Sequence, residues 1–423
     1  MGEGNSLIRI RGDKGLWIIA ILFAMISIAS VFSASSFLAR EGGVSKTMVF
    51  LRQTASVMMG FVAMFICYHL PMRFYRRFAF TLFALSFLGL CLLFTPLRSE
   101  ANGAVRGLKI GPVTVQVFEI AKIGVILYLA RAIELWEYSL FTFKDFFLRL
   151  ALPIFAVCLL VLCNSFSSAI LIGFVSVLML IFMDIKWKYI FSMIGIVMLA
   201  VGMLYCIYLA AFKDHPDRYD IPFAGNVFNR FETVENRIGR HFSGEKLDES
   251  QMTQAQRKEW IDGHRQEINA RIAISEGGIS GKGPGKSTQR YYLSMAFSDF
   301  IYAFIVEEYG LLGGIGVIVL YLAFLLRCLR ISSGCGTTFA GAMIVGIAFL
   351  YATQAMMHIL VNVGILPITG HTLPLISHGG SAYAILGGAY GIILSVSKRQ
   401  QLQEEQKQQQ QSVENQTLGN YEK

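Results

Sequence analysis

Long apolar stretches alternate with short polar segments along this chain, which is the pattern of a protein that crosses a membrane several times. A membrane-spanning helix needs about 20 mostly apolar residues. Eight stretches reach or approach this length, one of them despite an internal glutamate and lysine. They are Leu16–Leu38, Thr54–Leu70, Phe78–Leu97, Val113–Leu129, Tyr189–Phe212, Phe300–Leu326, Thr337–Val361 and Thr372–Ser397.

A further apolar stretch, Leu150–Met183, is too long for a single crossing. It carries no charge over 34 residues, which as one helix would extend about 51 Å. The polar sequence Asn164–Ser168 interrupts it, so we predict two short spans joined by a polar turn, and ten spans in total. The first span lacks a small-residue cleavage site, which predicts a retained helix rather than a signal peptide.

Composition agrees with a membrane protein and excludes most other classes. Of the 423 residues, 54% are apolar and 15% are charged, and the mean hydropathy is +0.54. Soluble domains average roughly 25% charged residues, so this chain has too little charge to cover a water-soluble surface. Its seven cysteines show no metal-ligand spacing and lie mostly in apolar runs. The predicted fold class is an all-α polytopic membrane protein, and a disulfide-rich secreted protein is excluded.

The distribution of basic residues orients the spans, because lysine and arginine are enriched in cytoplasmic loops. With ten spans and a cytoplasmic N-terminus, the inner segments carry 15 lysines and arginines and the short outer loops carry 6. If Leu150–Met183 were one span, the balance would be 9 inside against 12 outside. The pattern therefore favours ten spans with both termini in the cytoplasm.

This topology divides the chain into three regions. Residues 1–15 are the cytoplasmic N-terminus and residues 16–399 are the membrane domain. Within that domain, Lys213–Phe297 is a large extracytoplasmic loop between spans seven and eight, with 13 basic and 12 acidic residues. Residues 400–423 are rich in glutamine and are expected to form a disordered or transiently helical cytoplasmic tail. The net charge of +9 forms no single stripe, so no nucleic-acid partner is expected.

Ionisable residues within spans are costly and are therefore candidates for function. Glu119 and Lys122 lie at i,i+3 in the fourth span and share a helix face. A purely structural ion pair is the alternative interpretation. The preceding turn, Asn102–Arg106, ends in an arginine that is either a substrate contact or solvated surface.

The eighth span holds three carboxylates. Asp299 lies at its outer end, where it is either a functional base or a helix cap. Glu307 lies about 12 Å deeper, beside Glu308, and two adjacent carboxylates at that depth require polar partners or a water-filled cavity.

A glycine-rich segment, Gly277–Ser287, precedes this span. It resembles a phosphate-binding loop, but a serine stands where the motif requires glycine and no strand precedes it, so nucleotide binding is rejected. Gly281 and Gly283, beside Lys282 and Lys286, could still bring backbone N–H groups close to a phosphate-like anion. A flexible hairpin is the alternative.

The link between the last two spans, Leu366–Ser381, contains two prolines and three glycines. Broken helix at membrane depth is tolerated only where it is buried in protein or lines a cavity. His371 and His378 lie seven apart but lack a third ligand, so no metal site is predicted. The residues expected to shape a cavity are Pro367, Gly370, Pro374, Gly379 and Gly380, and those expected to contact substrate are Thr369, Ser377 and Ser381.

Most of these candidates fall on the outer side of the membrane under the ten-span topology. Cytoplasmic nucleotide sugars are not accessible there, so any group transfer must use an already activated substrate, such as a sugar on a lipid pyrophosphate. Basic residues suit a pyrophosphate, and a lone outer carboxylate suits a general base.

The chain resembles the SEDS family (shape, elongation, division and sporulation), whose branches include FtsW, RodA and SpoVE. The resemblance covers Leu16–Ser397. Its strongest stretches are Gly277–Gly285, Phe297–Gly310 and Gly364–Ser381. Phe32–Ser36 and Leu373–Ser377 look more like the division branch, FtsW, than the elongation branch.

The resemblance implies a peptidoglycan glycosyltransferase of a bacterial cytoplasmic (inner) membrane, acting at the division septum. Such proteins polymerise lipid II, the undecaprenyl-pyrophosphate-linked disaccharide pentapeptide. They work with a class B penicillin-binding protein, a transpeptidase, and with other divisome proteins. By resemblance, Asp299 is the essential carboxylate, Arg106 the loop arginine, and Glu119 and Lys122 the polar pair of the fourth span. No cofactor is certain, and a divalent cation, Mg²⁺ or Mn²⁺, would act at the pyrophosphate.

This chain departs from the family pattern at several positions. Gly107 stands where tryptophan is common, and Val117 stands where proline is common. The segment Cys163–Ser168 lacks a common acidic residue, and His378 replaces a usual tyrosine. Three alternative functions stay open: a lipid II flippase, an elongation-type (RodA-like) polymerase, and a non-catalytic scaffold for the penicillin-binding protein. Charged residues in spans and broken helices also occur in transporters.

Overall fold

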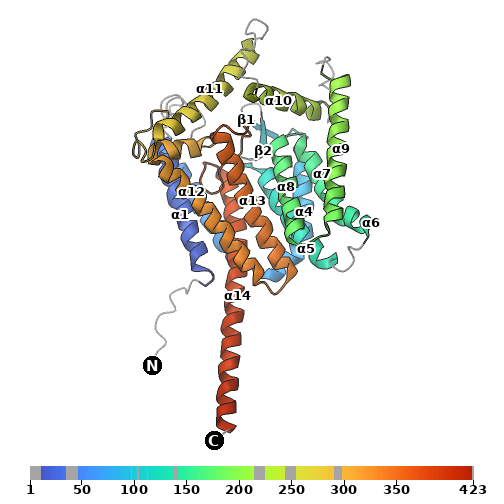
Figure 1. Ribbon diagram of the computed structural model, residues 1–423, viewed down its shortest axis with the longest axis vertical. Helices are drawn as coiled ribbons and strands as arrows, with labels where there is room; N and C mark the ends of the chain where they lie inside the picture. Colours follow the sequence, from blue (N-terminus) through green and yellow to red (C-terminus); the bar gives the residue numbers. More distant parts are fainter. Residues whose placement is uncertain are drawn as a thin grey trace.

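The computed structural model describes residues 11–34, 46–96, 98–101, 104–111, 113–136, 142–213, 224–242, 254–289 and 298–421. Figure 1 shows most of its helices gathered into one bundle. Two helices, α10 (Ala224–Phe242) and α11 (Gln254–Gly277), lie across one end of the bundle, and α14 (Gly380–Tyr421) projects far beyond the other end.

The remaining helices form the bundle and its connections. They are α1 (Lys14–Ala34), α3 (Lys46–His69), α4 (Met72–Leu92), α5 (Val117–Trp136), α6 (Phe143–Phe146), the π-helical turn η1 (Phe147–Ala151), α7 (Leu152–Leu162), α8 (Phe166–Phe182), α9 (Trp187–Ala211), α12 (Ile301–Ser333) and α13 (Thr338–Asn362). Eight helices in the described part of the chain are long and apolar enough to cross a membrane; α8 is shorter, and α5 carries internal charges. The prediction of a helical, polytopic membrane protein is therefore confirmed.

The polar interruption predicted within Leu150–Met183 is present. Helix α7 ends at Leu162 and α8 begins at Phe166. Ser165 is the N-cap of α8, and its side chain accepts a hydrogen bond from the Ser168 backbone N–H. Serine is a favoured N-cap residue because its hydroxyl satisfies an otherwise unpaired N–H of the first turn.

A small sheet departs from the all-helical expectation. Its antiparallel strands, in the order β1-β2-β3, are β1 (Arg98–Ala101), β2 (Ala104–Ile110) and β3 (Val113–Val115). The predicted start of the fourth span at Val113 is wrong, because α5 begins at Val117. The valines at 113 and 115 flank a threonine, and such β-branched residues favour a strand where a partner strand is available.

Glycine allows two distant helices to pack closely at the centre of the bundle. Helices α3 and α14 run side by side. A Cβ built at Gly387 would overlap the backbone of Gly60, and one built at Gly391 would overlap Met64 O. Small residues at such contacts let helix backbones approach within a membrane.

The C-terminal segment continues α14 as one helix to Tyr421, where the sequence suggested a disordered or transiently helical tail. Glutamine, glutamate and lysine are good helix formers. The start of this extension is tied to the bundle, since Gln400 Nε2 donates to Ile331 O at 2.6 Å and Gln401 Oε1 accepts from Gly12 N at 2.7 Å.

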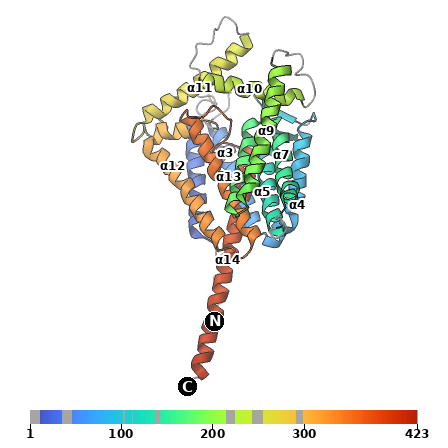
Figure 2. The same ribbon diagram turned by 45° about the vertical axis from the view of Figure 1, so that its right-hand side comes forward.

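The large loop contributes an amphipathic helix that covers the end of α9 (Figure 2). An apolar cluster joins the two helices: Tyr208 of α9 and the C-cap residue Phe212 pack with Phe228 and Phe231 of α10. The rings of Phe212 and Phe228 lie 4.1 Å apart, centroid to centroid. Stacked and tilted aromatic pairs of this kind stabilise the contact beyond the area they bury.

Candidate active site

Asp299 lies in the turn that leads into α12 and is only 9% exposed. The N-cap of α12 is the next residue, Phe300, whose side chain makes no capping hydrogen bond. Asp299 is therefore not the N-cap residue of α12. The Asp299 carbonyl accepts a hydrogen bond from Asn362 Nδ2 at 3.0 Å, and the Ser298 carbonyl accepts one from Ser377 Oγ at 2.8 Å. Side chains of two other elements thus fix the turn that carries Asp299.

Gly370 lies beside this carboxylate. Its φ is +72°, and a Cβ built at this position would stand 4.0 Å from Asp299 Oδ2. A larger residue would be strained in this left-handed conformation and would direct its side chain toward Asp299. The backbone conformation therefore favours glycine here, whereas a methyl group would make only an ordinary van der Waals contact with the carboxylate oxygen.

Residues 363–379, which contain Gly370, form no helix, and side chains from distant elements hold their backbone. Gln354 Nε2 donates to Thr372 O at 3.0 Å, and His358 Nδ1 lies 2.8 Å from His371 O. Six further backbone carbonyls of this segment accept hydrogen bonds from side chains of other elements. The pairs, with the donor first, are Arg271 to Gly364 O, Arg237 to Ile368 O, Ser167 to Thr369 O, Tyr321 to Pro374 O, Tyr383 to Leu375 O and Ser27 to Ile376 O. The predicted broken helix is confirmed, and protein side chains satisfy its backbone as burial requires.

A polar stripe on α13 was missed by the sequence analysis. Gln354, His358 and Asn362 follow one another at intervals of four, which places them on one helix face, and each is at most 1% exposed. Asn362 reaches Asp299, His358 reaches the link, and Gln354 Oε1 accepts from Lys122 Nζ at 2.8 Å. The signal was available, because three amide or imidazole side chains at i, i+4 and i+8 of an apolar span mark a single buried face.

The predicted pair on α5 is present. Lys122 Nζ donates to Glu119 Oε1 at 2.6 Å, and the two side chains are 1% and 9% exposed. With Gln354 as the second acceptor, two of the three ammonium N–H groups have described partners. Glu119 Oε2 has no hydrogen-bond partner among the described residues. The geometry is that of a buried ion pair, and the third N–H of Lys122 has no partner among the described residues.

Two of the serines predicted to contact substrate, Ser377 and Ser381, bind backbone atoms. Ser377 Oγ accepts from Leu373 N at 2.8 Å in addition to its bond to Ser298. Ser381 Oγ donates to Thr114 O at 2.8 Å and accepts from Gln116 N at 3.2 Å, so it joins the start of α14 to the start of α5. The other residues predicted to shape a cavity or to contact substrate lie close by in the chain. The link contains Pro367, Thr369, Pro374 and Gly379, and Gly380 begins α14.

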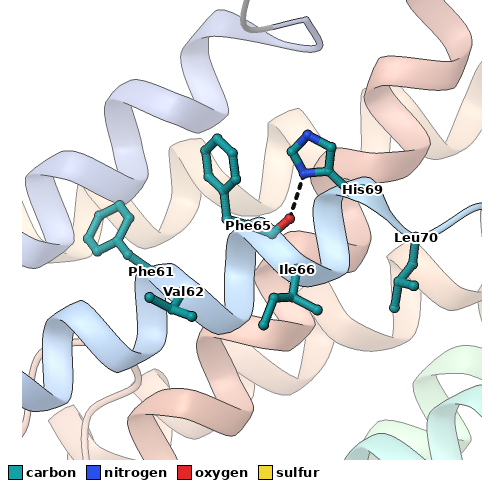
Figure 3. Close-up of a pocket in the computed structure, with 6 residues that line it drawn as sticks. All are labelled: Phe61, Val62, Phe65, Ile66, His69 and Leu70. Carbon is teal, nitrogen blue, oxygen red and sulfur yellow. Dashed lines mark hydrogen bonds between the residues drawn. The ribbon is translucent and has the colours of Figure 1, made fainter. Parts of the chain in front are cut away.

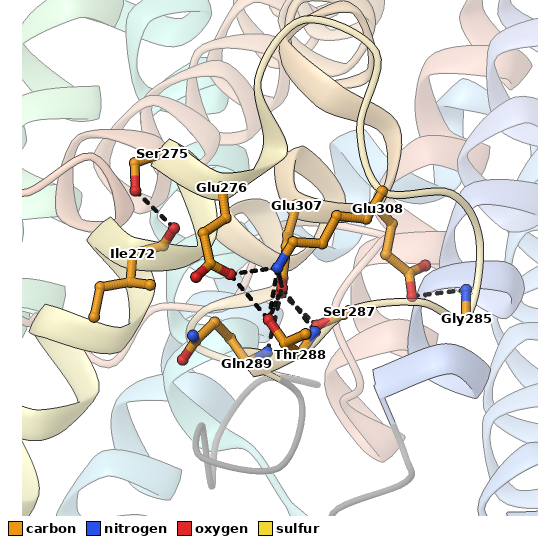
Figure 4. Close-up of polar contacts among 10 residues, drawn as sticks. Ile272, Ser275, Glu276, Gly285, Ser287, Thr288, Gln289, Glu307 and Glu308 are labelled. Carbon is orange, nitrogen blue, oxygen red and sulfur yellow. Dashed lines mark hydrogen bonds and ion pairs between the residues drawn. The ribbon is translucent and has the colours of Figure 1, made fainter.

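The carboxylates deeper in α12 have partners in the glycine-rich segment, as Figure 4 shows for Glu307 and Glu308. Lys282 Nζ donates to Glu307 Oε1 at 2.8 Å and also pairs with Glu276. Glu308 Oε1 accepts from Gly285 N at 2.8 Å and from Ser33 Oγ at 2.5 Å. The ammonium group expected to meet a substrate phosphate is therefore bound by carboxylates of the protein itself.

The neighbouring residues of this segment are more open. Gly281 and Gly283 adopt φ values of +77° and +99°, which favour glycine. The Lys286 side chain is exposed and forms no hydrogen bond or ion pair with any residue that the structure describes.

Arg106 lies on β2, and its side chain falls outside the described residues. The next residue, Gly107, explains one departure from the family pattern. A Cβ built at Gly107 would overlap Val115 O of the adjacent strand. The sheet therefore places its backbone where the tryptophan common in the family could not be accommodated without a shift of the strands.

Among the described residues, no three His, Cys, Asp or Glu side chains gather where they could hold a metal ion. The two histidines of the link have different neighbours. His378 Nδ1 lies 2.6 Å from Gln53 Oε1. Burial, together with the charge of Lys122, lowers the pKa of His371 to about 3, so its imidazole is neutral at physiological pH.

A hollow of about 750 Å³ lies on the surface of α3, away from these residues (Figure 3). Its lining is apolar except for one side chain, His69, whose Nδ1 lies 2.8 Å from Phe65 O. The lining residues are Phe61, Val62, Phe65, Ile66, His69 and Leu70. This surface lacks the convergent polar groups of a reaction centre.

Known proteins align with this sequence over nearly its whole length. The model of the FtsW/RodA/SpoVE family, described as cell cycle protein, matches residues 13–224 and 250–402. The chain is 28% identical over 396 residues to "Probable peptidoglycan glycosyltransferase FtsW" of Geobacter sp. (strain M18), covering 92% of this chain and 98% of that protein. It is 29% identical over 399 residues to the protein of the same name from Bacillus subtilis (strain 168), covering 91% and 90%.

Two solved structures share the fold. One is the rod shape determining protein RodA of Thermus thermophilus, with a TM-score of 0.62 and 20% identity over 93% of this chain and 99% of that one. The other is a chain of a peptidoglycan synthase complex, with a TM-score of 0.67 and 20% identity over 92% and 98%. The resemblance in the sequence motifs is confirmed: the chain belongs to the FtsW/RodA/SpoVE (SEDS) family of membrane proteins, in the FtsW branch.

Proposed function

We propose that this chain is a peptidoglycan glycosyltransferase that polymerises lipid II into glycan strands at the outer face of the bacterial cytoplasmic membrane during septal wall synthesis. Relatives that align over nine-tenths of the chain carry this activity in their names. Within the chain, the buried Asp299 carboxylate carries the proposal, since it lies in a turn that Asn362 and Ser377 fix and that faces the broken link at Gly370.

The proposed topology has ten spans, namely α1, α3, α4, α5, α7, α8, α9, α12, α13 and α14. Eight helices qualify by length and composition, and the Asn164–Ser165 turn supports a separate crossing for α8. The ion pair of Glu119 with Lys122 supports α5 as a span, because pairing lowers the cost of burying both charges. Both termini would lie in the cytoplasm, with Lys213–Phe297 outside.

In the proposed reaction, lipid II attacks a growing strand that is linked to a lipid pyrophosphate. The 4-hydroxyl of the terminal N-acetylglucosamine of the incoming lipid II forms a bond to the anomeric carbon of the donor sugar. The bond from that carbon to the pyrophosphate oxygen breaks, with inversion. Asp299 accepts the hydroxyl proton as general base, which typically contributes about 10²–10⁴-fold to rate.

The leaving pyrophosphate requires positive charge. Among the described residues, Glu119 and Gln354 accept from two of the three ammonium N–H groups of Lys122, and Arg106 lies on β2, which precedes α5 in the chain. We assign both to the stabilisation of the leaving group. A divalent cation would add to this charge; no three His, Cys, Asp or Glu side chains gather to hold one in the part of the chain that the structure describes.

The partner in this proposal is a class B penicillin-binding protein that cross-links the new strand, together with other divisome proteins. The fold is shared with a chain of a peptidoglycan synthase complex that is described as coordinating polymerization and crosslinking. This similarity supports such an assembly.

The deciding experiment supplies purified lipid II to the full-length protein in detergent and measures glycan polymer. A polymerase forms polymer without a sealed bilayer, whereas a lipid II flippase or a scaffold forms none. The charged residues in the spans and the broken helix would also suit a flippase. Absence of polymer, together with transfer of lipid II across the bilayer of vesicles, would therefore overturn the proposal in favour of transport.

A further inference from the structure

Helix α12 consists of two helical segments joined at Gly310. This residue has φ +71° and ψ −172°, which no helical residue adopts. A Cβ at Gly310 would overlap Ile279 O of the glycine-rich segment. The first segment, residues 301–309, begins just after Asp299, and the break allows it a direction of its own.

The break frees backbone groups of α12, and the glycine-rich segment binds them. Two carbonyls of α12 accept N–H groups from this segment, and two N–H groups of α12 donate to its carbonyls. The four bonds are Lys282 N to Glu307 O at 3.0 Å, Gly283 N to Glu308 O at 2.9 Å, Leu311 N to Gly278 O at 2.9 Å and Leu312 N to Ile279 O at 3.4 Å. The segment therefore replaces the helical hydrogen bonds that the break removes.

Side chains reinforce this backbone pairing (Figure 4). Glu307 is fully buried. Its Oε1 accepts from Lys282 Nζ at 2.8 Å, Thr288 N at 2.8 Å and Gln289 N at 3.2 Å, and its Oε2 accepts from Ser287 Oγ. A buried carboxylate is tolerated only with such compensation.

The same ammonium group reaches α11, where Lys282 forms an ion pair with Glu276. The hydrogen bond from Lys282 lowers the pKa of Glu276, so this carboxylate stays ionised at physiological pH. Lys282 therefore joins three elements: the last turn of α11, the glycine-rich segment and the first segment of α12.

Residues 298–309 are consequently held at both ends. At the start, Asn362 and Ser377 bind the carbonyls of Asp299 and Ser298. At the far end, Glu307 is bound by the glycine-rich segment through Lys282. A change at either end would be expected to shift the turn that carries Asp299, because the helical segment between them is short and rigid.

We propose that Lys282 and Glu307 are positioning residues of the transfer reaction, which act by holding the first segment of α12 so that Asp299 faces the acceptor hydroxyl. This inference rests on the proposed function. It gives Lys282 a different role from the phosphate contact that its sequence context suggests.

The test measures kcat and KM for lipid II polymerisation by full-length Lys282→Met and Glu307→Gln. We expect kcat to fall about 10- to 100-fold, because a small misplacement of a reacting group slows a reaction by such factors. KM should stay within about twofold of the wild-type value. The double variant should be no slower than the slower single variant. In an Asp299→Asn background, neither change should lower kcat further, because the group that they position is already absent.

Matched controls come from another lysine–glutamate pair among the described residues of the large loop. Lys213 Nζ lies 2.6 Å from Glu235 Oε1, a contact between the end of α9 and α10 that does not involve α12. Lys213→Met and Glu235→Gln should leave both constants unchanged. If Lys282→Met fails to fold, Thr288→Val decides the question, since it removes the hydroxyl that bonds Glu307 and Glu276 but keeps every charge; we expect a several-fold lower kcat at constant KM.

Three results would overturn the inference while the proposed function stands: a raised KM with unchanged kcat, which would make Lys282 a substrate contact; unchanged constants in all variants; or a further loss in the Asp299→Asn background. An inactive wild-type protein would instead contradict the proposed function itself.

Discussion

The side-chain amide of Asn362 donates a hydrogen bond to the backbone carbonyl of Asp299 at 3.0 Å, and this bond connects the end of α13 to the turn before α12. The same side chain accepts from Ala303 N at 2.9 Å through Oδ1. One buried amide therefore orients both the candidate base and the first turn of the helix that follows it.

Replacing this amide should reduce both stability and activity. Asn362→Leu would remove the hydrogen bonds of this amide to the Asp299 carbonyl and to the Ala303 N–H, and a buried polar group that loses its partner costs about 1–3 kcal/mol. We expect a lower Tm and slower lipid II polymerisation. Asn229→Leu on the exposed face of α10 is the control and should change neither. An Asn362→Leu protein with unchanged Tm and rate would show that this amide does not position Asp299.

Asp299→Asn separates the catalytic role from a structural one. The amide is close in size to the carboxylate but cannot accept the hydroxyl proton, so we expect polymerisation to fall about 10²–10⁴-fold. Lipid II binding should persist, because the pyrophosphate contacts are assigned to Arg106 and Lys122. Polymer yield and lipid II affinity of the purified, folded variant are the measurements. Full activity would remove the general base from the mechanism.

The buried pair of α5 allows stability and function to be measured apart. Lys122→Met leaves Glu119 buried without its cation, which should cost about 3–5 kcal/mol. The double variant Glu119→Gln, Lys122→Met removes both charges and should recover most of the lost Tm. Its polymerisation should stay low if Lys122 stabilises the leaving group. Recovery of activity together with stability would reduce the pair to a structural ion pair.

Cysteine labelling tests the topology. A membrane-impermeant thiol reagent should label a cysteine at Ser243, which lies outside the described residues, in intact spheroplasts. It should not label one at Gln410 on the helical extension of α14. The unsubstituted protein, with its seven free cysteines, sets the background. Labelling at Gln410 would reverse the orientation and would exclude an outer-face substrate for these residues.

Truncation tests the extension of α14. Removal of residues 400–423 should leave polymerisation by the purified protein intact, because the contacts described for the tail are with Ile331, Cys335 and Gly12. It should nevertheless lower the Tm, since the bonds of Gln400 and Gln401 to Ile331 and Gly12 are lost, at about 0.5–1.5 kcal/mol each. A shorter truncation that keeps residues up to Glu405 should retain the Tm. Loss of purified activity with either folded truncation would assign the tail to the catalytic unit.

Local sequence patterns were sufficient to predict most of the membrane-spanning helices and part of the candidate site. The polar turn at Asn164–Ser165 and the i,i+3 pair of Glu119 and Lys122 depend on neighbouring residues only, and both are present in the structure. The strand at Val113–Val115 was assigned to a span because an apolar run three residues long has no periodicity of its own, and only its pairing with β2 decides its conformation.

Long-range contacts could not be predicted in this way. The partners of Glu307 lie about twenty residues earlier in the chain, and the acceptor of the Asn362 amide lies 63 residues earlier. Asn362 and His358 look unremarkable singly, because one amide or imidazole in a span has many possible partners. Their function becomes evident only when the link and the turn before α12 are placed against the same face of α13.

The manner in which residues 363–379 are held has a consequence for biosynthesis. Their carbonyls bind side chains of α1, α8, α10, α11, α12 and α13, all of which are translated earlier, and of α14, which is translated later. A nascent chain can therefore insert every earlier span and still lack the surroundings of Asp299. The surroundings of the proposed base would be completed only when α14 joins the bundle, so a chain that ends before α14 would be a membrane protein in which Leu375 O lacks its bond to Tyr383.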